Sequence, residues 1–99
     1  MRASGEAALD DQLLTDAAEG DPAAWAVLVD RHCELVWTTA VQLVGDELGG
    51  VVSELVWLRL ASCLGGQQPS GGTGEWLRQA VWDECARQRT LHGLPLADV

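Results

Sequence analysis

The chain has 99 residues, which is enough for one domain and not for two. Hydrophobic residues make up 47% of the sequence, which argues against a generally disordered chain. Six arginines stand against fifteen acidic residues, and the net charge of −9 argues against independent, high-affinity binding to a phosphate backbone.

Helical spacing of apolar residues runs through most of the chain and predicts an all-α fold of four helices without strands. The predicted elements, in chain order, are a flexible tail at 1–6, helices over 7–19, 22–44, 48–64 and 75–90, and an irregular tail at 91–99. The whole stretch from 7 to 90 is expected to form a single helical domain, a small four-helix bundle.

Turn residues mark the boundaries of these helices. Gly20 ends the first helix, and Asp21 with Pro22 starts the second, as an N-cap acceptor followed by proline at the first helical position. A Gly-Asp pair at 45–46 separates the second helix from the third. The segment GGQQPSGGTG, residues 65–74, contains five glycines and one proline and separates the third helix from the fourth.

The third predicted helix is apolar over most of its circumference. In the stretch GGVVSELVWLRL, residues 49–60, only Ser53, Glu54 and Arg59 have polar side chains. A helix in a soluble protein usually keeps one polar face. Trp57 lies on the side of Glu54, away from the more apolar side, so an exposed Trp57 would be an anchor for a protein partner.

The other tryptophans are expected in the core. The chain has five tryptophans and neither phenylalanine nor tyrosine, so a small bundle needs Trp to fill its interior. This interpretation covers Trp25, Trp37 and Trp76, and for Trp57 it stays open as the alternative to an exposed anchor. Trp82 belongs to a different pattern in the last helix, where Arg78, Trp82 and Arg89 share one side.

Two interpretations of that side stay open. Arginines beside an exposed ring are typical of a nucleic-acid contact. The acidic residues of the same helix balance its arginines, however, which favours a solvated face with an Arg–Trp contact. The balancing residues are Glu75, Asp83 and Glu84.

Catalytic and metal-binding motifs are missing from the sequence, so we expect neither an enzyme nor a cofactor. His32 and His92 are isolated, and no nucleophile, zinc-protease or phosphate-loop pattern occurs. The cysteines are odd in number and form no CxxC pair, which excludes a disulfide framework. A metal- or thiol-dependent sensor is retained as a third hypothesis. Its candidate residues would be His32, Cys33, Cys63 and Cys85.

The start of the chain lacks the apolar stretch of a secretion signal, and no apolar run approaches the length of a membrane span. We therefore expect a reduced, cytoplasmic protein with no membrane contact.

Three segments together resemble a known family. They are EGDPAAWAVLVDRHCELVWTTAVQLVGD, VVSELVWLRL and GEWLRQAVWDECARQR, which follow an acidic first helix in this order. The chain resembles region 2 of bacterial RNA polymerase sigma factors of the extracytoplasmic-function type, over roughly residues 13 to 90. The matching positions are Gly20-Asp21, Gly45-Asp46, Val51-Val52, Glu54, Leu58-Arg59-Leu60 and Trp76-Leu77.

The resemblance implies a protein-docking helix. In the family, the helix with the motif DVVQE docks on the clamp helices of the polymerase β′ subunit. Here Gly50 replaces the Asp of that motif and Ser53 replaces its Gln, while Glu54 is kept. The candidate partner-binding residues are therefore Gly50, Ser53, Glu54 and Trp57.

Other departures concern DNA. Asp83 stands where the family has Asn, Arg87 stands where it has Asp, and the preceding loop carries no charge. The family's second DNA-binding domain has no counterpart in these 99 residues. We therefore expect a domain that acts in or modulates transcription initiation by contacting the polymerase, and that binds DNA only weakly or within a complex. The alternative is a repurposed module that binds a sigma or anti-sigma regulator or forms a homodimer.

Overall fold

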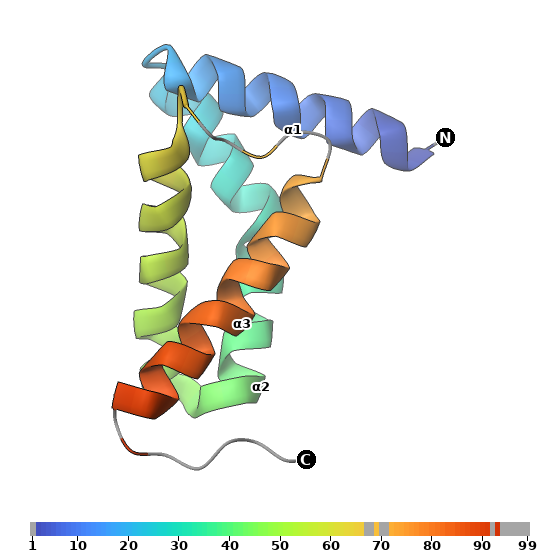
Figure 1. Ribbon diagram of the computed structural model, residues 1–99. Coiled ribbons are helices and arrows are strands. Elements are labelled where there is room, and N and C mark those ends of the chain that lie inside the picture. The colour runs from blue at the N-terminus through green and yellow to red at the C-terminus, as the bar shows by residue number, and fades with distance from the viewer. Residues whose placement is uncertain (1, 67–68, 70–71, 92, 94–99) are drawn as a thin grey trace.

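The computed structural model describes residues 2–66, 69, 72–91 and 93, with side chains from residue 8 onward. Within these residues the chain is all-helical, with α1 (Arg2–Ala18), α2 (Pro22–Cys63) and α3 (Thr73–Leu91) and no strand (Figure 1). Helix α1 therefore includes residues 2–6, which the sequence analysis assigned to a tail, because most of these residues favour a helix. Leu91, the first residue of the predicted irregular tail at 91–99, instead ends α3, and of the other residues of that tail only Gly93 is described.

The predicted second and third helices form a single element, α2, that is interrupted at Gly45, so the count of four helices is not confirmed. Gly45 lies inside α2 with φ 89° and ψ 175°, a conformation that interrupts the helix and that L-residues rarely adopt. We call residues 22–44 the first arm and residues 46–63 the second arm. The chain reverses direction between them, so the arms run antiparallel, side by side (Figure 1).

Close contact near the bend depends on a second glycine. A Cβ atom built on Gly49 would lie 2.8 Å from Cγ2 and 3.2 Å from Cα of Val41. Such distances are shorter than van der Waals contact, so only glycine at this position allows the two arms to approach so closely.

The start of α2 follows the sequence prediction. The Asp21 side chain accepts hydrogen bonds from the backbone N–H groups of Ala23, at 3.0 Å, and Ala24, at 3.4 Å. Pro22 occupies the first helical turn, where its missing N–H costs nothing. Gly20 adopts φ 97° just before this cap, so α1 ends and α2 begins within a few residues.

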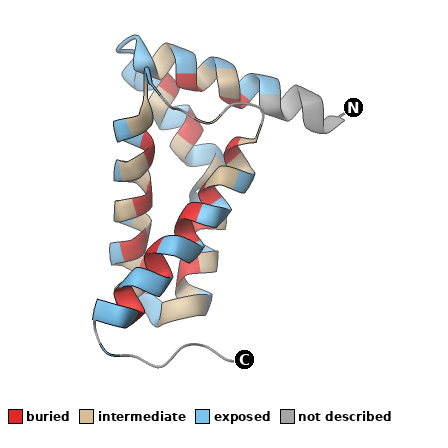
Figure 2. Ribbon diagram, viewed as in Figure 1, coloured by how far each residue is buried: buried red, intermediate tan, exposed pale blue. Residues whose placement is uncertain are grey.

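The core lies where α3 packs against the two arms, and α1 covers one end of it (Figure 2). Buried side chains face inward on all three helices. The main core residues are Leu14 of α1, Leu28, Val36, Ala40, Val52, Val56 and Leu60 of α2, and Leu77, Ala80, Val81 and Cys85 of α3. None of the helices in the described part of the chain is long and apolar enough to cross a membrane.

A buried carboxylate attaches α1 to α2. Asp10 is buried and accepts a hydrogen bond from Nε of Arg31 at 2.9 Å. Its other oxygen lies 3.0 Å from Nε2 of His32. Because α1 places few fully buried apolar side chains in the core, this polar cluster complements the anchor that Leu14 provides.

Candidate protein-docking surface

The four predicted partner-binding residues lie on one side of the second arm. Gly50, Ser53, Glu54 and Trp57 recur at helical spacing. Glu54 is exposed, and the other three residues are partly buried. The structure therefore brings these positions together, with the carboxylate of Glu54 available to a partner.

A groove runs beside Glu54. Its lining residues are Trp25, Glu54, Trp57, Leu58 and Ala61. Trp25 comes from the first arm and meets Trp57 edge to face, with ring centroids 6.1 Å apart and planes at 82°. Leu58 is 63% exposed, although it is a large aliphatic residue.

Trp37 extends this surface toward the bend. It is 45% exposed, which corrects the expectation that it lies in the core. A Cβ atom on Gly50 would lie 3.9 Å from the Trp37 ring, so the ring borders the second arm at the predicted site. We call Trp25, Trp37, Gly50, Glu54, Trp57, Leu58 and Ala61 the docking surface.

Sequence reasoning missed four members of the docking surface. Leu58 and Ala61 could have been found from the helical spacing that relates them to Glu54. Trp25 and Trp37 belong to the other arm, and their placement depends on how the bend at Gly45 aligns the arms.

Ser53 differs from its neighbours on this side. Its hydroxyl oxygen is buried and has no hydrogen-bond partner among the described residues. A direct contact between this atom and a partner would need a side-chain movement, so the exposed members of the docking surface are the better candidates for binding. Glu54 supplies the only ionisable group among the five residues that line the groove.

The predicted nucleic-acid constellation on α3 is not assembled. Arg78 is exposed and pairs with Glu75 at 2.9 Å, and Trp82 is 51% exposed. Arg89, however, is buried and donates a hydrogen bond to the backbone carbonyl oxygen of Leu43. The bend of α2 covers this end of α3, which removes Arg89 from the surface that the other two residues share.

The remaining described arginines are also engaged. Arg59 of the second arm lies 3.4 Å from the buried carboxylate of Glu84 and 4.0 Å from Asp83. Its guanidinium carbon is 5.8 Å from the centre of the Trp76 ring, within range of a cation–π contact. Arg87 also reaches Glu84, at 4.0 Å. No cluster of unpaired arginines is therefore present in the part of the chain that has described side chains.

The residues of the sensor hypothesis do not converge. His32 is paired with Asp10, and Cys33 is exposed on the first arm. Cys85 is buried in the core, and this burial raises the pKa of its thiol. Among the described residues, no group of three or more His, Cys, Asp or Glu side chains is placed to hold a metal ion.

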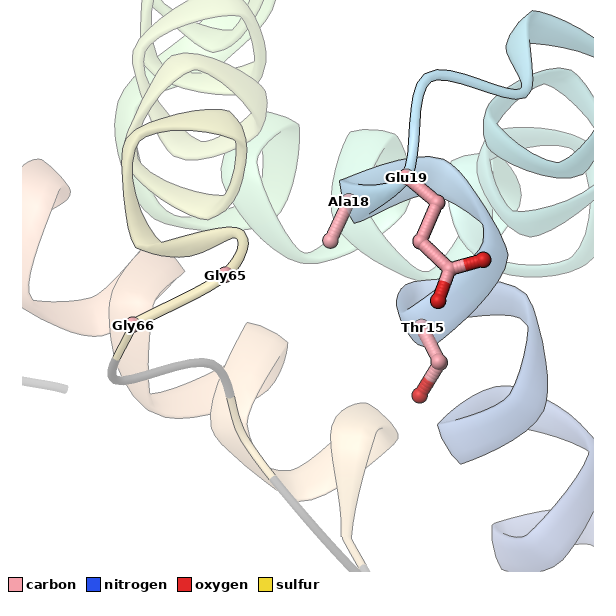
Figure 3. Close-up of a pocket in the computed structure, with 5 residues that line it drawn as sticks. All are labelled: Thr15, Ala18, Glu19, Gly65 and Gly66. Atoms are coloured by element: carbon pink, nitrogen blue, oxygen red, sulfur yellow. The ribbon is translucent and has the colours of Figure 1, made fainter.

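A second hollow lies where the ends of α1 and α2 meet. Figure 3 shows Thr15, Ala18 and Glu19 on one side of it and Gly65 and Gly66 on the other. Glu19 is the only ionisable residue among the five that line this hollow. It shares no lining residue with the docking surface.

Comparison with protein-family models, curated proteins and solved structures found no match to this chain. The chemistry of the docking surface follows from its own residues. It offers aromatic faces, exposed aliphatic carbon and one carboxylate, a combination typical of protein–protein contacts. It offers no cation that would attract nucleic acid.

Proposed function

We propose that this chain is a sigma-region-2-like domain that acts in or modulates transcription initiation by docking on the β′ clamp helices of RNA polymerase. The observation that carries the proposal is the position of Glu54, which lies exposed in a groove between exposed aliphatic and partly buried aromatic side chains. Glu54 is also the residue that the sequence keeps from the family's docking motif.

The chemistry of the groove favours a helical partner with mixed character. A basic side chain of the partner would pair with Glu54, and an apolar side chain would cover Leu58 and the Trp57 ring. Tryptophans at the centre of an interface often contribute more than 2 kcal/mol to binding. The docking surface has this pattern, with one charge among apolar groups.

The state of the arginines supports a role without independent promoter binding. The arginines with described side chains are paired with carboxylates or with a backbone carbonyl. Approach to DNA would break these contacts while the net charge of −9 repels the phosphates. A second chain would then supply the promoter contacts.

A second candidate function uses the same surface for another partner. Gly50 and Ser53 stand where the family has polar contact residues, which favours a changed specificity toward a sigma or anti-sigma regulator. Under this alternative, the clamp helices would not bind, although the docking surface would still be a binding site.

A titration separates the two candidates. A clamp-helix fragment without tryptophan is added to the protein, and the Trp fluorescence is followed. We expect saturable binding that Glu54→Arg and Leu58→Asp weaken by about tenfold or more, because each variant removes a central contact. The matched controls are Glu47→Arg and Leu91→Asp, which alter exposed residues outside the docking surface.

Circular dichroism of each variant verifies that the fold is retained. If no binding is detected at about 50 μM fragment, the affinity is too low for a specific complex, and the clamp is rejected as the partner. Equal weakening by the control variants would reject the docking surface as its site.

A further inference from the structure

The first arm has an exposed stripe outside the docking groove. Val27, Asp30, Glu34 and Trp37 follow one another at intervals of three, four and three residues, which places them along one side of the helix. All four are exposed, and Val27 and Trp37 are 48% and 45% accessible. The outer stripe, as we call these four residues, spans about 15 Å along the helix.

The two carboxylates at the centre of the outer stripe lack cationic partners. Neither Asp30 nor Glu34 takes part in an ion pair with any described residue. Arg31 belongs to the same arm, but its guanidinium is held by Asp10 of α1. Both carboxylates are exposed to solvent and are available to a cationic partner.

The spacing and the charge together define the partner. We infer that the outer stripe binds a basic amphipathic helix, with two cationic side chains opposite Asp30 and Glu34 and apolar side chains against Val27 and Trp37. Intervals of three and four residues are those at which one helix offers contacts to another helix packed along it. Opposite charges would set the register and speed the encounter.

Other occupants fit less well. A second copy of the chain would place the same carboxylates and the same net charge of −9 against the stripe, which is repulsive. Nucleic acid would be repelled for the same reason. The stripe lies outside the groove beside Glu54 and meets the docking surface only at Trp37.

The test uses a designed helical peptide as the probe. In this peptide, Leu, Lys, Lys and Leu follow one another at intervals of three, four and three residues, so that they share one side of the helix. A scrambled peptide of equal composition is the control. We expect ¹H–¹⁵N NMR signals of residues 27–37 and the Trp37 indole to shift on addition of the first peptide at 0.15 M salt. The scrambled peptide is expected to bind about tenfold more weakly, because it cannot align charge and apolar groups together.

Charge-matched variants locate the contact. The double variant Asp30→Arg/Glu34→Arg is expected to lower the affinity for the peptide by about tenfold. The double variant Glu19→Arg/Glu47→Arg changes the net charge by the same amount and is expected to have a small effect on this affinity. Glu54→Arg tests independence from the proposed function, and it should leave this peptide unaffected. Equal loss in both double variants, equal binding of the scrambled peptide, or concentration-dependent dimerisation through Trp37 would overturn the inference.

Discussion

Arg89, near the end of α3, donates a hydrogen bond to the backbone carbonyl oxygen of Leu43, just before the bend of α2. The non-helical conformation of Gly45 interrupts the hydrogen-bond ladder, so carbonyl groups in the last turn of the first arm lack their usual partners. The guanidinium supplies one of these partners and joins α3 to the bend. This contact ties the geometry of the α2 hairpin to the packing of α3.

Replacement of Arg89 should therefore loosen the hairpin. We expect Arg89→Met to lower the free energy of unfolding by about 1–3 kcal/mol, because it removes the side-chain donor from the partly buried carbonyl oxygen of Leu43. Urea denaturation measures the change. Arg87→Met is the control, since Arg87 is exposed and its contact to Glu84 is long, and it should cost less than about 0.5 kcal/mol. Equal losses in both variants would contradict a specific role for Arg89.

Three glycines of α2 should respond differently to alanine. Gly45→Ala forces alanine into a region at φ 89° and ψ 175° that is essentially restricted to glycine, and it is expected to cost about 1–3 kcal/mol, although the space around it is open. Gly49→Ala forces Val41 away and is expected to cost about 1–3 kcal/mol. Gly50→Ala meets only ordinary contact and should stabilise the helix by about 0.5–1 kcal/mol. Thermal unfolding of the three variants tests this order, and a stabilising Gly45→Ala would refute the bend.

These glycines also explain how far the sequence predicts the fold. The Asp21-Pro22 start of α2 is a local signal, because the cap and its acceptor positions are adjacent in the chain, and the prediction is confirmed. The break at Gly45 was found, but its geometry was not. A glycine near a helix end marks a break without fixing the angle between the flanking segments. That angle depends on packing between the two arms, such as the close approach of Gly49 to Val41.

The Asp10 cluster should contribute strongly to the attachment of α1. We expect Asp10→Asn to lower the free energy of unfolding by about 1–3 kcal/mol, because the amide cannot accept from both Arg31 and His32 as the carboxylate does. Asp30→Asn, on the exposed side of the first arm, is the control and should have little effect. Hydrogen exchange should show the larger loss of protection in α1, and a uniform loss across all helices would contradict a local attachment.

The same long-range contacts limit prediction of the site. Helical spacing places Gly50, Ser53, Glu54 and Trp57 on one side of a helix without any tertiary information. It cannot tell that Trp37, twenty residues from Trp57 along the chain, borders that side and stays exposed. The positions of Trp37 and Arg89 depend on the bend, so they could not be read from periodicity alone.

Cys85 should make stability depend on pH in the alkaline range. Burial raises the pKa of its thiol, and the nearby Arg89 opposes this effect only in part. The unfolded thiol therefore loses its proton at a lower pH than the folded one. Stability from this group is complete below the unfolded pKa of about 8.5 and falls as the pH rises above it.

Comparison with Cys85→Ala isolates this contribution. The difference in unfolding free energy between wild type and variant is expected to decrease from pH 8 to pH 10, and a difference that is constant over this range would contradict it. A thiol reagent provides an independent measurement. Exposed Cys33 should react first, whereas Cys85 should react only as the protein unfolds.

The isolated chain should not bind duplex promoter DNA at physiological salt. On α3 the exposed Arg78 is paired with Glu75, the exposed Arg87 has a carboxylate of Glu84 at 4.0 Å, and Arg89 is buried against the bend. Each exposed arginine of this helix therefore has an acidic neighbour. Fluorescence anisotropy of a labelled promoter fragment at 0.15 M salt is expected to stay flat up to about 50 μM protein, a concentration within the range of roughly 1–100 μM that is typical of non-specific dissociation constants. Glu75→Arg with Asp83→Arg reverses two exposed charges on this helix and serves as a positive control. This variant is expected to bind the fragment, and its binding should weaken steeply with added salt. A comparable, salt-dependent signal from the wild type would show that the arginine pairs open readily, and it would contradict the prediction that the chain does not bind DNA.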